Sequence, residues 1–116
     1  MHIEVRKSGD VVILDLKGKL TAGLGDQILR ESVDELLAEG WKKILVSLSA
    51  VSFMDSAGLG ELVAGLRTAK RLGAELKLLN VSERVQATLY MAKLLPVFEM
   101  YSSEEEALAH FAGSHS

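Results

Sequence analysis

A carboxylate and a hydroxyl group stand side by side at Asp55 and Ser56, and glycines follow at positions 58 and 60. A serine hydroxyl can accept a phosphoryl group, or it can cap a helix by accepting a hydrogen bond from a backbone N–H group. The cap is the simpler interpretation, and either Asp55 or Ser56 can provide it. Each glycine costs a helix about 1 kcal/mol relative to alanine. The pair therefore indicates a close approach to the backbone, either by a partner or by the protein's own interior.

Phosphorylation of Ser56 would place about two negative charges near the start of a helix. Free N–H groups and the positive end of the helix dipole favour an anion there, so we expect the domain to tolerate the phosphate. A partner packed against the same helix end would meet the added charge and bulk. This arrangement predicts a switch that changes binding without unfolding the protein.

Other combinations of reactive side chains are weak. The histidines stand at positions 2, 110 and 115, and we expect them to be solvated rather than to bind a metal. Residues 23–25 lack the third glycine and the lysine of common phosphate-binding loops. Ser56 has neither a Gly-x-Ser-x-Gly context nor a suitably spaced histidine. We therefore predict a protein without catalytic activity, cofactor or metal.

The periodicity of apolar residues predicts the elements that position this segment. Alternation and short apolar runs predict strands at residues 3–7, 11–16, 44–48, 76–79 and 97–101. Helical spacing predicts helices whose apolar residues span 24–37, 59–69, 85–92 and 108–111. Ser82 and Ser103 are expected to cap the last two helices, the latter through a capping box. Residues 17–25 and the stretch before Asp55 are expected to be loops.

This order predicts an α/β domain, because strand-helix-strand units pair their strands in parallel while the first two strands form a hairpin. We expect a four- or five-stranded mixed sheet with about four helices, mainly on one face. The predicted domain covers residues 1–112, and residues 113–116 are expected to form a flexible tail. Trp41 and Phe53 are expected to pack internally, whereas Met54 is equally suited to the core and to anchoring a partner.

The composition limits the classes of function. The chain has 116 residues, of which 48% are hydrophobic and 25% charged, with a net charge of -3 and no cysteine. These values favour one folded domain, exclude disulfides and suit the cytoplasm. No basic stripe indicates a nucleic-acid partner. The N-terminal residues do not resemble a signal peptide, and no apolar run approaches the roughly 18 residues of a membrane span, so membrane insertion is not expected.

Residues 51–60, Val-Ser-Phe-Met-Asp-Ser-Ala-Gly-Leu-Gly, closely resemble the signature of anti-sigma factor antagonists in the STAS (sulfate transporter and anti-sigma factor antagonist) family. The resemblance includes Gly-Lys-Leu at 18–20 and residues 73–80, and it covers almost the whole chain. It implies a STAS fold. Ala57 stands where the family often has a second serine, which leaves Ser56 as the hydroxyl next to the aspartate. Thr21 replaces a common acidic residue, which affects the expected details of kinase recognition.

The resemblance implies a mechanism. An unmodified antagonist binds an anti-sigma factor that is also a serine kinase, and this binding frees a sigma factor for RNA polymerase. The kinase uses ATP to phosphorylate the antagonist, the complex dissociates, and a serine phosphatase restores the unmodified form. Carried over to this sequence, Ser56 is the acceptor and Asp55 helps to position its hydroxyl. Ser52 is the competing acceptor, in an expected loop.

The partner is expected to contact the start of the Ser56 helix and the loop from Thr21 to Leu24, since loops on a rigid scaffold commonly carry function. The predicted partner-binding residues are Thr21, Gly23, Leu24, Met54, Asp55, Ser56, Ala57, Gly58 and Gly60. Two alternatives remain. The chain can be a stand-alone STAS subunit of a stress-signalling assembly or of a membrane lipid transporter; without long extensions, a fused transporter or sensor is not expected. A small enzyme such as a nucleotide hydrolase is the other alternative, but no set of residues supports it.

Overall fold

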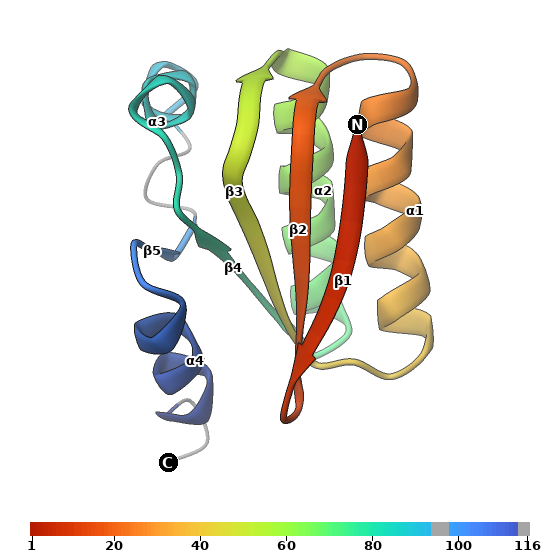
Figure 1. Ribbon diagram of the computed structural model, residues 1–116. Coiled ribbons are helices and arrows are strands. Elements are labelled where there is room, and N and C mark those ends of the chain that lie inside the picture. The colour runs from red at the N-terminus through yellow and green to blue at the C-terminus, as the bar shows by residue number, and fades with distance from the viewer. Residues whose placement is uncertain (94–97, 114–116) are drawn as a thin grey trace.

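The computed structural model describes residues 1–93 and 98–113, although it leaves out the side chains of residues 24–26 and 112–113. These residues form five strands and four helices; two strands come first, and helices and strands alternate after them (Figure 1). In chain order they are β1 (His2–Ser8), β2 (Val11–Leu20), α1 (Leu24–Ala38), β3 (Lys43–Met54), α2 (Ser56–Arg71), β4 (Glu75–Leu79), α3 (Glu83–Met91), β5 (Met100–Tyr101) and α4 (Glu104–Gly113). The predicted α/β order is confirmed.

The strands form one mixed sheet in the order β1-β2-β3-β4-β5. Strand β1 pairs antiparallel with β2, placing Ile3 opposite Leu16, and the remaining neighbours are parallel. Across the parallel strands, Val12 lies opposite Ile44 and Ile44 opposite Leu76. Strands covered on both faces are apolar in successive residues, which explains the continuous apolar runs at the start of β2 and in β3.

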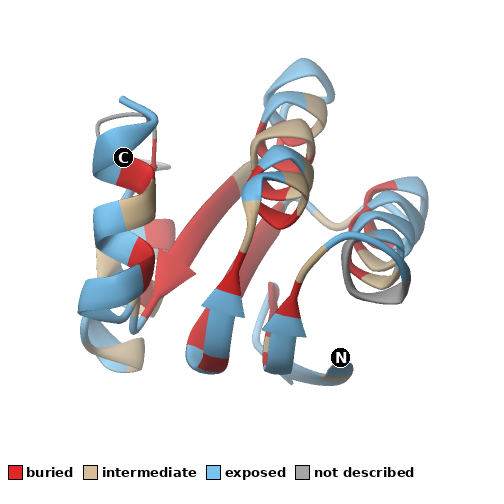
Figure 2. Ribbon diagram, turned by 90° about the horizontal axis from the view of Figure 1, so that it is seen from above, coloured by how far each residue is buried: buried red, intermediate tan, exposed pale blue. Residues whose placement is uncertain are grey.

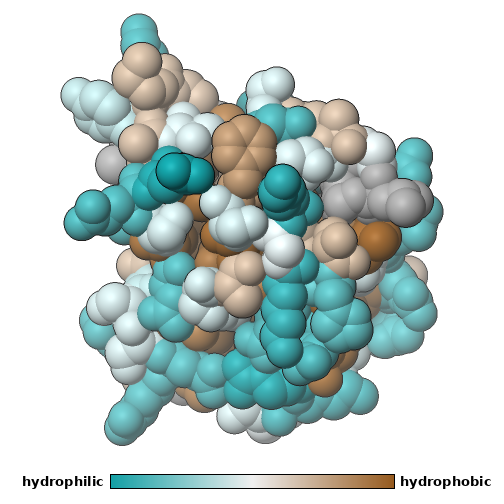
Figure 3. Space-filling model, turned by 45° about the horizontal axis from the view of Figure 1, so that its top comes forward, coloured by the Kyte–Doolittle hydropathy of each residue, from teal (hydrophilic) through white to brown (hydrophobic). Residues whose placement is uncertain are grey.

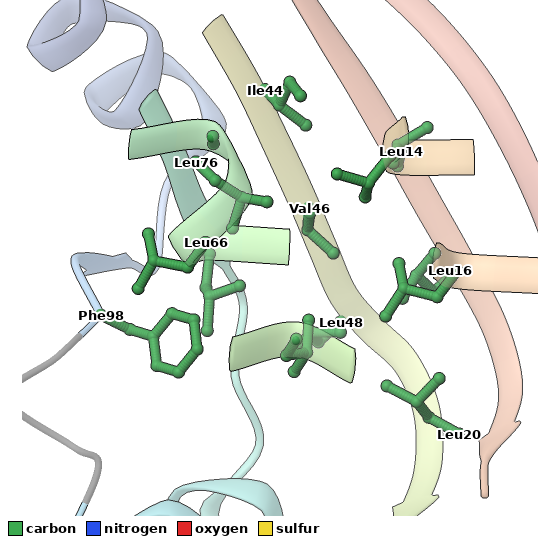
Figure 4. Close-up of a cluster of buried hydrophobic side chains, with 14 of the residues drawn as sticks. Leu14, Leu16, Leu20, Ile44, Val46, Leu48, Leu66, Leu76 and Phe98 are labelled. Atoms are coloured by element: carbon green, nitrogen blue, oxygen red, sulfur yellow. The ribbon is translucent and has the colours of Figure 1, made fainter. Parts of the chain in front are cut away.

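The larger hydrophobic core lies between the sheet and the helices α1, α2 and α3. Leu14, Ile44 and Leu76 project from three neighbouring strands into this core, where Leu66 of α2 joins them (Figure 4). Burial is concentrated in the strands and on the sides of the helices that face them (Figure 2). Helices mainly on one face were predicted, and this core confirms the expectation.

Helix α4 covers the opposite face of the sheet. It completes a second, smaller cluster made of Val11, Ile13, Leu45, Leu79, Ala107 and Phe111. Arg6 links the hairpin to the start of this helix, with 2.7 Å between its Nη2 and Oε1 of Glu104. The predicted cap is also present, because Oγ of Ser103 accepts a hydrogen bond from the Glu106 N–H group.

One predicted loop is shorter than expected and another is absent, because the strands before them extend beyond their apolar runs. Strand β2 continues to Leu20, which pairs with Met54, although residues 17–25 were expected to be a loop. Register shifts near Asp15 and Gly18 interrupt the apolar alternation without ending the strand. Strand β3 likewise continues to Met54, so the stretch before Asp55 is strand rather than loop.

Smaller differences concern the C-terminal part of the chain. Strand β5 has two residues, Met100 and Tyr101, where an edge strand over 97–101 was predicted. Residue 97 lies outside the described residues. Gly113, which was expected to begin a flexible tail, is the last residue of α4. Residues 114–116 lie outside the described part of the chain.

Candidate functional site

The Asp55–Ser56 pair lies where β3 passes directly into α2. Asp55 has an extended backbone and is the N-cap of α2, and its Oδ1 accepts a hydrogen bond of 2.9 Å from the Gly58 N–H group. Ser56 is the first helical residue, and it is exposed. The cap that the sequence left open between two residues is therefore provided by Asp55, and the Ser56 hydroxyl is not used for it.

Asp55 also ties this helix start to the end of β2. Its second carboxylate oxygen accepts a hydrogen bond of 3.0 Å from the Ala22 N–H group, and its own N–H group donates to the Leu20 carbonyl at 3.2 Å. The hydrogen bonds from Gly58 and then Ala22 lower the pKa of Asp55, because they favour its ionised form. The two connections that sequence analysis singled out are thus adjacent at one end of the sheet.

The predicted residues of the β2–α1 connection lie next to Ala22, which donates the hydrogen bond to Asp55. Thr21 is half-buried next to Ala22, and Gly23 is exposed at the N-cap of α1. Gly23 has φ of +103°, a conformation that favours glycine. Leu24 begins α1, but its side chain lies outside the description. Gly23 is therefore explained by the turn it makes.

The two glycines of the Ser56 segment have different surroundings. A Cβ atom at Gly58 would lie 2.1 Å from the carbonyl oxygen of Leu20, so close internal packing requires glycine there. A Cβ atom at Gly60 would meet nothing within 4 Å, and Gly60 is exposed. The sequence could not distinguish packing from a partner's approach, and the structure assigns packing to Gly58 while leaving Gly60 on the open surface.

The remaining residues of the segment divide between core and surface. Met54 is 3% exposed and belongs to the larger core, so its side chain is unavailable as a surface anchor. Phe53 is 42% exposed, which makes the expectation of internal packing wrong. Ala57 is half-buried. Ser52 is exposed, and it lies on β3 rather than in a loop. Its hydroxyl donates a hydrogen bond of 3.4 Å to the Gly18 carbonyl. Trp41, the other residue expected to pack, is partly buried against the core.

A groove between α2 and α3 begins at Ser56. It has a volume of about 710 Å³, and Leu59, Arg84, Ala87, Thr88, Met91 and Ala92 line it together with Ser56. Met91 is 80% exposed at this groove, and the neighbouring Tyr90 is 69% exposed. The α3 side of the groove was not predicted from the sequence. Its signal was the spacing of Arg84, Thr88 and Met91, which places them along one side of the helix capped by Ser82.

Two further expectations were that the histidines bind no metal and that the chain does not insert into a membrane. Within the described residues, no three histidine, aspartate or glutamate side chains are grouped closely enough to hold a metal ion. His110 instead lies against Tyr101, with 4.7 Å between the ring centroids. His115 lies outside the described residues. No helix in the described part of the chain has the length and apolar character needed to cross a membrane.

Comparison with protein families identifies the domain as a whole. The model of the STAS domain family matches residues 2–107. The chain belongs to the STAS domain family. This STAS domain is 27% identical over 108 residues to the anti-sigma F factor antagonist of Paenibacillus polymyxa, covering 93% of this chain and 92% of the relative.

Solved structures show the same fold. The STAS domain superposes on the crystal structure of the Thermotoga maritima protein TM1081 with a TM-score of 0.86 and 28% identity, covering 93% of this chain and 92% of that chain. The Bacillus cell fate determinant SpoIIAA in its phosphorylated form gives a TM-score of 0.75 at 23% identity, covering 95% of this chain and 99% of that chain. The second likeness concerns the fold alone.

Proposed function

We propose that this STAS domain is an anti-sigma factor antagonist in a phosphorylation-controlled partner switch. The unphosphorylated form binds an anti-sigma factor that has serine kinase activity, and this binding releases a sigma factor. Phosphorylation of Ser56 reverses the binding, and a serine phosphatase restores the unmodified form. The domain itself acts by binding and without catalysis, in the cytoplasm.

The observation that carries this proposal is the position of Ser56. Its side chain is exposed at the first residue of α2, while the helix start beneath it is held by Asp55 through hydrogen bonds to Gly58 and Ala22. A kinase can reach the hydroxyl without opening the core. The resulting phosphate projects from the surface that the partner is proposed to cover.

In the proposed reaction, the Ser56 oxygen attacks the terminal phosphorus of ATP bound to the partner kinase. The bond between that phosphorus and ADP breaks, and the hydroxyl proton passes to a base of the kinase. Asp55 remains ionised in the neutral range, because its hydrogen bonds lower its pKa. In the proposed complex it holds the backbone of Ser56 in place rather than taking the proton.

Co-purification from the native cell followed by mass spectrometry identifies the partner. Recovery of a kinase-fold anti-sigma factor supports the proposal, whereas recovery of a transporter ATPase or a stress-signalling assembly without one contradicts it. The recovered kinase and ATP are then used to map the phosphorylated residue. Phosphate on Ser52 with Ser56 unmodified would refute the site.

Three variants test the switch with that kinase. Ser56→Ala should abolish phosphorylation and keep binding, because it removes the acceptor and leaves the Asp55 cap in place. Ser56→Asp should weaken binding, though less than phosphate, since it adds one charge rather than nearly two. Ser52→Ala is the matched control and should be phosphorylated like the wild type. Full binding by the protein phosphorylated on Ser56 would refute the mechanism.

A further inference from the structure

The groove between α2 and α3 is lined by one cation and by the proposed phosphate acceptor. Ser56 lines it from α2 and Arg84 lines it from α3. Among the other described residues that line the groove, Thr88 is polar and neutral, and the rest are apolar. Arg84 is thus the one charged residue on these described walls. The molecular face seen in Figure 3 is mixed, with hydrophilic and hydrophobic side chains side by side.

The guanidinium group of Arg84 has no ion-pair partner among the described residues, and the side chain is exposed. Two other arginines are engaged in ion pairs: Arg6 with Asp15 and Glu104, and Arg30 with Asp34 and Glu61. The backbone carbonyl of Arg84 accepts a hydrogen bond from the Thr88 hydroxyl at 3.2 Å, and this hydrogen bond does not involve the guanidinium group. Its charged group is therefore available for an incoming anion.

The start of α2 already holds one negative charge next to Ser56. The Asp55 carboxylate already accepts hydrogen bonds from the Gly58 and Ala22 N–H groups, so an anion occupies this helix end before phosphorylation. A phosphate on the adjacent Ser56 adds about two negative charges next to that carboxylate. Like charges on adjacent residues repel, and a cation nearby would offset this repulsion.

We propose that Arg84 binds the phosphate of phosphorylated Ser56 across the groove between α2 and α3. The guanidinium group can donate two parallel hydrogen bonds to phosphate oxygens. The ammonium group of lysine lacks this forked geometry. The contact draws the two walls together over the apolar side chains of Leu59 and Met91. Phosphorylation then links α2 to α3 in addition to charging the surface. This inference rests on the proposed function of Ser56.

The test installs phosphoserine at position 56 during protein synthesis, so that it does not depend on the kinase. Titration followed by phosphorus NMR should show the second pKa of the phosphate in the wild type about one unit below that in Arg84→Gln, because a nearby cation favours the dianion. Asp55 and Glu83, the acidic residues adjacent in sequence to Ser56 and Arg84, are unchanged in both proteins and cancel in the comparison. Arg84→Lys should give an intermediate value.

Arg67→Gln is the matched control, because Arg67 is also exposed but does not line the groove. It should titrate like the wild type. With phosphoserine at position 56, the wild type and Arg67→Gln should unfold at a higher temperature than Arg84→Gln. The three unmodified proteins should unfold at similar temperatures. Equal phosphate pKa values in the wild type and Arg84→Gln would overturn the proposed contact.

These readouts separate the two proposals. If the cognate kinase modifies another residue while the installed phosphoserine still shows the shift, the proposed function fails and the Arg84 contact stands. If the kinase modifies Ser56 and binding is switched, but Arg84→Gln leaves the phosphate pKa unchanged, the contact fails and the proposed function stands.

Discussion

Gly58 and Gly60 lie two residues apart in α2, yet they face opposite surroundings. A Cβ atom at Gly58 would lie 2.1 Å from the Leu20 oxygen, whereas one at Gly60 would meet nothing within 4 Å. We call the side formed by Asp55 and Gly58 the inner side of the helix start, and the side formed by Ser56 and Gly60 its outer side. The inner side fixes α2 against the end of β2. This fixed attachment allows the outer side to change its charge or its partner while the fold stays in place.

The largest effect is expected when the inner side is overfilled. Gly58→Ala should lower the free energy of unfolding by about 3 kcal/mol, because the new methyl group meets a backbone oxygen that cannot move without disturbing β2. Gly60→Ala is the matched control and should raise it by up to about 1 kcal/mol, as alanine favours a helix. Urea unfolding of both variants measures the difference. Similar effects of the two changes would contradict the division into two sides.

A smaller effect is expected from removing the hydrogen bonds of the inner side. Asp55→Ala removes the acceptors for the Gly58 and Ala22 N–H groups, so its unfolding temperature at neutral pH should fall below that of the wild type. The pKa of Asp55 is lowered in the folded state, so its contribution is full above the unfolded value of about 3.9 and is lost as pH falls through the lower folded value. The difference in unfolding temperature should narrow in that acidic range.

Asp34→Ala is the control for this pH dependence. Asp34 forms an exposed ion pair with Arg30 at 3.1 Å within α1, an arrangement that contributes little to stability. Its unfolding temperature should follow that of the wild type across the same pH range. A difference between Asp55→Ala and the wild type that stays constant down to pH 2 would show that the carboxylate charge contributes nothing to holding the helix start.

The elements of this fold could be predicted because their apolar periodicity is strong, but their ends could not. Strand β2 continues through Lys17 and Lys19, which are exposed, and its pairing with β3 rather than burial keeps it a strand. Periodicity reports burial, so the predicted strand ended at the exposed residues 17–19, before Leu20 returns to the core. The caps at Ser82 and Ser103 were predictable because a local side-chain-to-backbone hydrogen bond defines them.

The candidate site was predictable only in its local part. Ser56 and Asp55 follow from their order at a helix start, but the division between Gly58 and Gly60 depends on how α2 lies against Leu20. That arrangement joins residues far apart in sequence. The same holds for Arg84, which lines one groove with Ser56 because of the packing of α3; no sequence pattern spans the two segments.

The outer side should respond in binding rather than in stability. Gly60→Trp fills exposed space, so folding should be nearly unchanged while the affinity for the proposed partner falls at least tenfold, or about 1.4 kcal/mol. Titration calorimetry with the partner measures this loss. Lys70→Trp, at an exposed position in the last turn of α2, adds the same bulk away from Ser56 and should bind normally. Unchanged affinity of Gly60→Trp would place the partner elsewhere.

The smallest effect on stability is expected at Ser56 itself. From the sequence, replacing this serine would cost up to a helix cap, about 1 kcal/mol, because Ser56 and Asp55 were equal candidates for that role. The structure gives the cap to Asp55 and leaves the Ser56 side chain exposed at the first helical position, where alanine is well tolerated. Ser56→Ala should therefore change the free energy of unfolding by less than about 0.5 kcal/mol. Urea unfolding of the unmodified proteins tests this, with Asp55→Ala as the comparison. A loss at Ser56 as large as that at Asp55 would mean that the hydroxyl belongs to the inner side, and a phosphate there would then disturb the fold as well as the proposed complex.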